Sequence, residues 1–464
     1  MFYEKSFIES EFYQLTMGTT SKSIALVLVA LFLITLVTVP SVQPVHAALS
    51  WSVQILDKNA APGGHAPIEV DSNNILHMAY CGTTILHQET LWSNGYATLN
   101  GADWIIQERP FGYVTDLKLD ADNNPHMLID PGVYSPLTYA KWTGTEWLTQ
   151  TIPSTERSVY ASLALDLSGN PHVAYTYGEG LQYARWTGSS WDIETVDASY
   201  SENAFMLSLV LDKNNRPYIL YANSSQYQDY VRAYNLLSVK LAVLKDSGWS
   251  IEPVLVNYNF SGCWNMVLDS KGYPHFLATL PQLRTQFSKI LYISWDGSTW
   301  KTQTVVSEAD LDNRGFLALD VQDNPNIVYS TRDNEVIYTY WTGADWKNQT
   351  VPTGNLVYVI DGPCYLALDS NGNPHISFRG PMPGQQHWRE ASILYASATG
   401  TKEFTQSPTI QPSSTTTPVF PLPIVAAAVV LVMFIVVVTV GALLFRRHQK
   451  LSLVKEDVEA NYGY

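Results

Sequence analysis

The residues best suited to chemistry in this chain are pairs of Asp and His that recur six residues apart. The histidines of these pairs are His77, His126, His172, His275 and His375. Imidazole can transfer protons near neutral pH or bind a metal ion, but a metal site needs several ligands within about 2.1 Å of one ion. Each of these histidines belongs to a different repeat of the chain, and equivalent positions of repeats lie far apart. We therefore predict structural histidines, each bonded to the Asp six residues earlier, with a ring of metal ligands as the alternative.

The Asp of each pair begins a short polar turn. The turns at Asp71, Asp120 and Asp369 resemble the first half of a calcium loop, yet they lack the distal Glu that completes an EF-hand. The sequence shows no G-x-S-x-G elbow, no H-E-x-x-H and no phosphate-binding loop. We expect these Asp residues to stabilise turns, and we predict no catalytic residue, no metal ligand and no cofactor.

Seven repeats carry these turns, and they predict the fold. The anchoring residues, spaced about 50 apart, are Asp71, Asp120, Asp166, Asp212, Asp269, Asp320 and Asp369. The unit at 163–196 shows four short strands separated by turn residues, at 163–166, 172–177, 181–186 and 191–196. A period near 50 with about four strands is typical of a propeller blade, because one such sheet must stack on neighbours to bury its faces. We predict an all-β, seven-bladed β-propeller with four-stranded blades.

Spacing within the repeats distinguishes two faces of the predicted ring. The D-x-x-x-x-P and W-x-G-x-x-W turns, which join strands 1–2 and 3–4, vary little in length, so we call their side the rigid face. The connections between strands 2 and 3 vary, and they share the opposite side, the variable face, with the links between blades. Insertions on one face of a repeat fold often mark a binding site. The long connections are 82–91, 223–237 and 379–392, with a moderate one at 279–289.

Aromatic and charged residues in two of these connections are our candidate binding residues. Such side chains suit the recognition of sugars or protein surfaces. They are Tyr227, Asp229, Tyr230, Arg232, Tyr234, Arg379, His387, Trp388, Arg389 and Glu390. The alternative is that they only pack their own loops. Three sequons make Asn223, Asn259 and Asn348 glycosylation candidates.

The chain contains one fourth-strand segment too many. Two segments, one at Trp51 and the other at Phe404, compete to be the fourth strand of the last blade. We expect the N-terminal segment to close the ring, because closure removes the exposed sheet edges. Closure would bring Cys81 and Cys364 to adjacent blades, so a disulfide between them is possible in an oxidising exterior, with Cys263 unpaired.

The chain ends predict a membrane protein. Residues 1–47 contain a short apolar run and a small-residue cleavage site typical of a signal peptide, with Met17 as an alternative start. A propeller at 48–404 precedes a Ser/Thr/Pro-rich stalk at 405–423 and an uncharged apolar segment at 424–445. Arginines and a lysine follow this transmembrane segment, so the tail 446–464 is expected in the cytoplasm and the propeller outside the cell. The net charge of −15 argues against nucleic acid as a partner.

One turn resembles a known motif. Ser294–Trp300 is similar to a shortened Asp-box turn of sialidase-like propellers, and the D-x-x-G-N-P-H units resemble repeats of prokaryotic cell-surface propellers. A sialidase-like enzyme would imply three arginines around a carboxylate and a Tyr nucleophile with a partner Glu. Arginines 157, 314, 332 and 379 fall on the variable face, but no motif selects a triad, so we assign no catalytic residue.

The function expected from these features is extracellular recognition or adhesion. A membrane-anchored propeller would bind a glycan or a protein through its variable face. A sialidase-like glycoside-active enzyme or a polysaccharide lyase is the first alternative. A structural surface protein without a specific ligand is the second.

Overall fold

The computed structural model describes most of the propeller region. The described residues are 49–60, 65–86, 89–101, 103–109, 112–130, 132, 135–156, 158, 160–177, 180–199, 207–224, 236–259, 265–281, 288–309, 315–331, 333, 335–353, 363–381, 391–400, 402, 442–443 and 446. The chain divides into two units, Met1–Thr405 and Gln406–Tyr464. Among the described residues no helix is long and apolar enough to cross a membrane. The predicted signal peptide, stalk and transmembrane segment lie almost entirely outside them.

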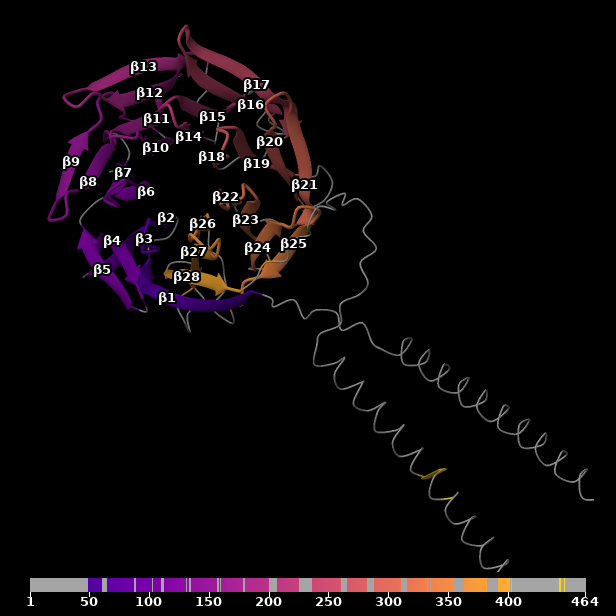
Figure 1. Cartoon of the computed structure of the whole chain (residues 1–464). Coiled ribbons are helices and arrows are strands. Elements are labelled where there is room, and N and C mark those ends of the chain that lie inside the picture. Colours follow the sequence, from indigo (N-terminus) through magenta and orange to yellow (C-terminus); the bar gives the residue numbers. More distant parts are fainter. Residues whose placement is uncertain are drawn as a thin grey trace, which may run out of the picture. The chain divides into compact units, whose positions relative to one another are not determined.

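Twenty-eight strands in the described part of the first unit form seven antiparallel blades around a ring (Figure 1). Blade 1 contains β2 (Ile68–Val70), β3 (Leu76–Leu86), β4 (Glu89–Asn100) and β5 (Asp103–Arg109). Blade 2 contains β6 (Tyr113–Leu119), β7 (Pro125–Asp130), β8 (Thr138–Trp142) and β9 (Trp147–Thr151). Blade 3 contains β10 (Ala161–Leu165), β11 (Pro171–Tyr177), β12 (Gly180–Trp186) and β13 (Trp191–Asp197). Blade 4 contains β14 (Leu207–Leu211), β15 (Pro217–Ser224), β16 (Leu236–Lys245) and β17 (Gly248–Asn259).

The remaining blades follow the same order. Blade 5 contains β18 (Met266–Leu268), β19 (Pro274–Pro281), β20 (Ser288–Trp295) and β21 (Trp300–Ala309). Blade 6 contains β22 (Phe316–Leu319), β23 (Pro325–Ser330), β24 (Val336–Trp341) and β25 (Trp346–Thr350). Blade 7 contains β26 (Tyr365–Leu368), β27 (Pro374–Pro381), β28 (Ala391–Thr399) and, as its outer strand, β1 (Ser50–Ala60). The predicted seven-bladed, four-stranded propeller is confirmed.

The N-terminal strand closes the ring. β1 pairs antiparallel with β28 from Ser50↔Thr399 to Ala60↔Ala391, and Ala60 also pairs with Gly82 of β3. The two ends of the ring therefore lie side by side in one blade, indigo beside yellow in Figure 1. The prediction that the segment at Trp51 completes the last blade is confirmed, and Phe404 lies outside the described residues.

The anchoring Asp residues hold the turns of the rigid face. Asp71 Oδ1 accepts hydrogen bonds from the backbone N–H groups of Asn73 and Ile75 at 2.8 and 2.7 Å. The other six anchors accept from the equivalent donors, two and four residues onward. The residue three after each anchor has positive φ, which only Gly, Asn and Asp adopt readily, and all seven positions hold one of these types.

Neighbouring turns are also joined to one another across four of the blade interfaces. The Asn or Asp with positive φ bonds the residue after the anchor of the preceding blade, as in Asn123 with Ser72 and Asp323 with Ser270. The pair Asn74 and Ser370 does the same across the closure point. These contacts join the turns of neighbouring blades at four of the seven interfaces of the rigid face.

Each repeated histidine is hydrogen-bonded to a tyrosine on the third strand of its own blade. In blade 2, His126 Nε2 lies 3.2 Å from Asp120 Oδ2, and its Nδ1 lies 2.5 Å from the Tyr139 hydroxyl. The hydrogen bond to tyrosine recurs at His77, His172, His275 and His375. At these four histidines Nε2 lies 3.5 to 3.8 Å from the Asp Oδ2, so the predicted hydrogen bond to the Asp is found at His126 alone among the five. These contacts agree with the structural interpretation of the histidines. Among the described residues no group of three or more His, Cys, Asp or Glu side chains could hold a metal ion.

A tryptophan from the outer strand of the next blade packs edge-on against each of the five histidine-bonded tyrosines and against Tyr338, the equivalent tyrosine of blade 6. Trp147 meets Tyr96 with ring centroids 5.4 Å apart, and Trp104 meets Tyr395 at 5.2 Å across the closure point. Trp51 meets Tyr338 at 5.6 Å, so it occupies the position that the outer-strand tryptophans hold in other blades. This contact explains why the Trp51 segment, rather than a free C-terminal strand, completes blade 7.

We expect Trp51→Ala to weaken ring closure and to lower the free energy of unfolding by about 2 kcal/mol, since Trp51 is only half buried. The variant removes the Tyr338 contact and the hydrogen bond from Trp51 Nε1 to Gln349, 3.1 Å long. Urea denaturation followed by tryptophan fluorescence measures the change. Trp104→Ala is the matched control and should cost a similar amount, whereas an unchanged midpoint for Trp51→Ala would contradict the role given to β1.

The proposed disulfide is not present, because Cys81 and Cys364 are both buried free thiols. Cys81 Sγ accepts the backbone N–H of Val114 at 3.3 Å, so it faces blade 2. Cys364 lies in the apolar cluster formed with Val328 and Val336 of blade 6. The two sulfurs therefore point into different blade interfaces, on opposite sides of the pair of blades that carries them. Burial raises the pKa of the Cys81 thiol to about 11 and that of Cys364 to about 12.

Candidate functional site

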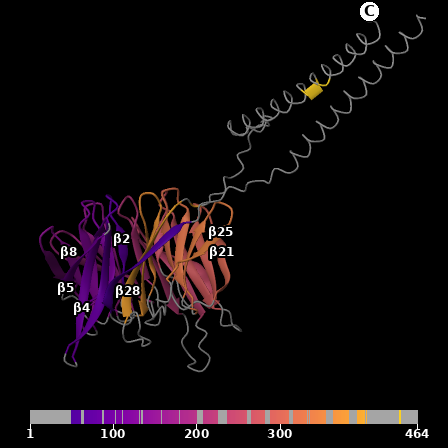
Figure 2. The same ribbon diagram turned by 90° about the horizontal axis from the view of Figure 1, so that it is seen from below.

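A cavity of about 490 Å³ follows the axis of the ring and is lined by the inner strands of all seven blades. The inner strands begin at the variable face and end at the Asp turns, so the cavity lies between the two faces. Figure 2 shows the ring from the side, with its strands running between the faces. A volume of this size lies within the range of small-molecule sites in proteins. The side chains that line this channel decide what it could bind.

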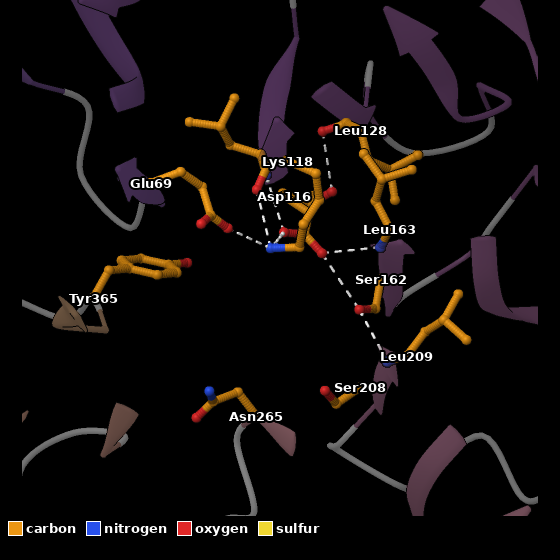
Figure 3. A network of polar contacts seen from close by, with 12 residues as sticks. Glu69, Asp116, Lys118, Leu128, Ser162, Leu163, Ser208, Leu209, Asn265 and Tyr365 are labelled. Atoms are coloured by element: carbon orange, nitrogen blue, oxygen red, sulfur yellow. Dashed lines mark hydrogen bonds and ion pairs between the residues drawn. The ribbon is translucent and has the colours of Figure 1, made fainter. Parts of the chain in front are cut away.

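A charged cluster occupies the channel wall at blades 1 and 2 (Figure 3). Lys118 Nζ lies 2.8 Å from Glu69 Oε1 and 3.1 Å from Asp116 Oδ1. Although burial lowers the pKa of Lys118, the two carboxylates raise it on balance, so the amine stays charged at neutral pH. The cluster carries one surplus negative charge, which favours neutral or cationic ligands over anions.

Hydrogen bonds around the channel join blades 2 to 6. Asp116 Oδ2 accepts from the Leu163 N–H at 2.9 Å and from Ser162 Oγ at 3.3 Å. Ser162 and Ser208 accept the N–H groups of Leu209 and Met266 in the next blades. Asn265 exchanges two hydrogen bonds with Leu317, at 2.7 and 2.8 Å. At each of these four blade interfaces the hydrogen bond is made by the residue four positions before an anchoring Asp. The same position of the repeat therefore stabilises four successive interfaces.

Aromatic residues take over this position near the closure point. The rings of Phe316 and Tyr365 lie 5.1 Å apart, and the Tyr365 hydroxyl is hydrogen-bonded to His65 Nδ1. Ser377 of β27 donates a hydrogen bond to the Ala66 carbonyl, which joins blade 7 to blade 1. One half of the channel is therefore polar and the other half aromatic, a combination that suits a sugar ring with its hydroxyl edges and apolar faces.

The channel residues were not predicted from the sequence. Glu69, Asp116 and Lys118 belong to no motif, and the residues four before the anchors differ in type from blade to blade. A signal was nevertheless present, since Asp116, Ser162, Ser208 and Asn265 are small or acidic hydrogen-bonding residues at one position of four successive repeats. Alignment of the repeats on their Asp anchors would have found it.

Most of the predicted binding residues fall outside the described residues. These are Tyr227, Asp229, Tyr230, Arg232, Tyr234, His387, Trp388, Arg389 and Glu390. Arg379 is described, and it differs from the prediction because it lies within β27 and is only 2% exposed. Burial raises the pKa of the Cys81 thiol and that of the Tyr113 phenol. The positive charge of Arg379 opposes this effect at both groups but does not outweigh it. Arg379 thus belongs to the wall between blades 7, 1 and 2 rather than to an exposed loop.

The predicted long connections are shorter than expected. β3 and β4 continue as a paired hairpin to Leu86↔Glu89, so 82–91 is mostly strand. β27 extends to Pro381 and β28 begins at Ala391. Two of the sequon residues, Asn223 and Asn259, lie at strand ends, whereas Asn348 is exposed on β25 and accepts a hydrogen bond from Thr339 at 3.0 Å.

Comparison with known proteins supports the fold. No protein-family description matches this sequence, and no curated protein resembles it in sequence. The polysaccharide lyase Uly1 is 9% identical with a TM-score of 0.50, over 77% of this chain and 94% of the lyase. A second polysaccharide lyase, an ulvan lyase, is 11% identical with a TM-score of 0.50, over 73% of this chain and 95% of that chain. The Aleuria aurantia lectin, solved with a fucose-containing disaccharide, is 12% identical with a TM-score of 0.42, over 63% and 97%. The two likenesses with a TM-score of 0.50 show the propeller fold alone.

Proposed function

We propose that this chain is a membrane-anchored extracellular protein that binds glycans through its variable face. The observation that carries the proposal is where the ring begins and ends. Ser50 pairs with Thr399, so both ends of the propeller lie at the rigid face. A stalk and membrane helix that follow residue 404 would leave from that face, and the variable face would be the one available to a ligand.

A glycan is the ligand class favoured by the chemistry of the channel. The polar half offers carboxylate, hydroxyl and amide groups, and the aromatic half offers Phe316 and Tyr365. The two propellers with TM-scores of 0.50 are polysaccharide lyases by name, which supports the idea that this fold can present a glycan site. A protein ligand on the same face is the alternative.

Membership of the sialidase-like, Asp-box superfamily is part of the proposal. Asp296 Oδ1 accepts hydrogen bonds from the N–H groups of Ser298 and Thr299, both at 2.8 Å, in the turn between β20 and β21. This local geometry supports the resemblance seen in the sequence. It gives no evidence of catalysis.

A polysaccharide lyase or another glycan-active enzyme is the second candidate function, favoured by the similarity to the two lyases. Such an enzyme needs an acid and a base that can exchange protons with the substrate. In the channel, the carboxylates Glu69 and Asp116 are both ion-paired with Lys118. The arginines at 157, 314 and 332 lie outside the described residues.

A glycan array probed with the full chain in detergent tests the proposal. We expect binding that is lost in Trp388→Ala or Tyr230→Ala and retained in Leu167→Ser, a matched change on the rigid face where Leu167 is 72% exposed. Release of unsaturated sugars from a bound polysaccharide would favour the lyase. An empty array, together with an empty pull-down of surface proteins, would favour the structural role and overturn the recognition proposal.

A further inference from the structure

Blades 4 and 6 lack the repeated histidine, and in blade 6 an asparagine replaces it. Asn326 stands there, fully buried, and accepts the Tyr338 hydroxyl on its Oδ1 at 2.5 Å. Its Nδ2 donates to the Asn324 carbonyl at 2.9 Å. The amide is therefore held in one orientation, and its carbonyl oxygen is polarised by a hydroxyl group.

A lysine far along the chain reaches this amide. Lys402, which follows the last strand of blade 7, places its Nζ 2.7 Å from Asn326 Oδ1. The same Nζ lies 5.7 Å and 6.0 Å from the ring centroids of Tyr338 and Tyr340. Asp320, the buried anchor of blade 6, attracts the ammonium electrostatically. An amine, an amide and a carboxylate thus meet in a largely apolar pocket.

We propose that Lys402 and Asn326 form an intramolecular isopeptide bond. The uncharged amine attacks Asn326 Cγ, and the carbonyl electron pair moves to Oδ1, where the Tyr338 hydroxyl stabilises the negative charge. The intermediate collapses as the Cγ–Nδ2 bond breaks, and the departing nitrogen takes the proton released by Nζ and leaves as ammonia. One amide forms, one ammonia leaves, and no oxidant or cofactor is consumed.

The environment favours each step. Burial lowers the pKa of Lys402 to about 8, against the opposing effect of Asp320 and Asp369, so about a tenth of the amine is uncharged at pH 7. Burial keeps the pKa of Tyr338 well above its ordinary value, so its hydroxyl retains the proton that it donates. Because Nζ lies 2.7 Å from Oδ1, the amine is already held beside the amide, and it must shift from Oδ1 toward Cγ to react. The bond would link the end of blade 7 covalently to blade 6. The two described cysteines form no such covalent link, since both are free thiols.

Mass spectrometry of the denatured full chain tests this inference, which does not depend on the proposed function. We expect the chain to be lighter by one ammonia than its sequence requires, and a tryptic digest to contain a branched peptide joining Asn326 to Lys402. Lys402→Arg is the matched control, because arginine keeps the charge but is not a nucleophile, and it should show the full mass for its sequence. Tyr338→Phe should leave a fraction of the chains unlinked.

Two results would overturn the proposal. One is a full-mass chain whose digest contains Asn326 and Lys402 in separate linear peptides after incubation at pH 8. The other is loss of ammonia without a branched peptide, which would show cyclisation of an asparagine elsewhere. The branched peptide is sought in the natural sequence, so the test does not require any variant to fold.

Discussion

Acidification from pH 7 to pH 4 should progressively destabilise the propeller, because five buried histidines must take up protons. Burial lowers the pKa of His77, His126, His172, His275 and His375. The largest resolved change is at His126, whose pKa falls from 6.5 to about 4. A histidine with a depressed pKa contributes stability that is complete above pH 6.5 and is lost as the pH falls toward 4. At His126 this loss amounts to about 3 kcal/mol.

The variant His126→Asn tests this explanation, and blade 6 supplies the precedent. Asn326 already accepts the hydroxyl of its tyrosine at the equivalent position, so the substituted amide can accept the Tyr139 hydroxyl. We expect a cost of about 1 kcal/mol at pH 7 for the lost contact with Asp120. Urea denaturation at pH 7, 6, 5 and 4 should show a shallower loss of stability than in the natural protein. Equal slopes in the two proteins would show that His126 does not contribute to the acid transition.

Lys118→Met should have the second large effect, and its pH dependence should have the opposite sign. Removing the ammonium leaves Glu69 and Asp116 facing each other in the channel, which we expect to cost about 2 kcal/mol at pH 7. This value is reduced because the Lys118 and Glu69 side chains are each 34% exposed to the channel. The two carboxylates would repel each other, so the folded variant binds protons more readily than the unfolded chain. The variant should therefore regain stability relative to the natural protein as the pH falls from 7 to 5.

Two further variants separate charge from packing in this experiment. Lys118→Arg keeps the positive charge and should leave stability within about 1 kcal/mol of the natural protein. Adding Glu69→Gln to Lys118→Met removes one carboxylate and should restore part of the loss at pH 7. A constant difference between Lys118→Met and the natural protein at every pH would mean that the lysine acts through its methylene groups alone.

The blade pattern could be predicted because its causes are local. Asp71 and its six equivalents bind backbone N–H groups only two and four residues away, and the positive φ at the fourth turn position admits few residue types. Proline begins the second strand where a backbone donor is not needed, and the outer-strand tryptophans recur with the same period. Even closure by the Trp51 segment followed from the sequence, because one surplus strand and one incomplete blade leave a single way to remove the sheet edges.

The contacts that cross between blades were decided only by the tertiary structure. Asp116, Ser162, Ser208 and Asn265 come together because seven twisted sheets bring their inner edges to one axis, and no local rule encodes that meeting. Side-chain direction turned Cys81 and Cys364 away from each other, although their blades are neighbours. Lys402 meets Asn326 across 76 positions of the sequence, since chain closure places the end of blade 7 against blade 6. The sequence by itself determined the repeating unit and how many units the ring contains, whereas the packing of units against one another determined the channel, the free thiols and the lysine–asparagine contact.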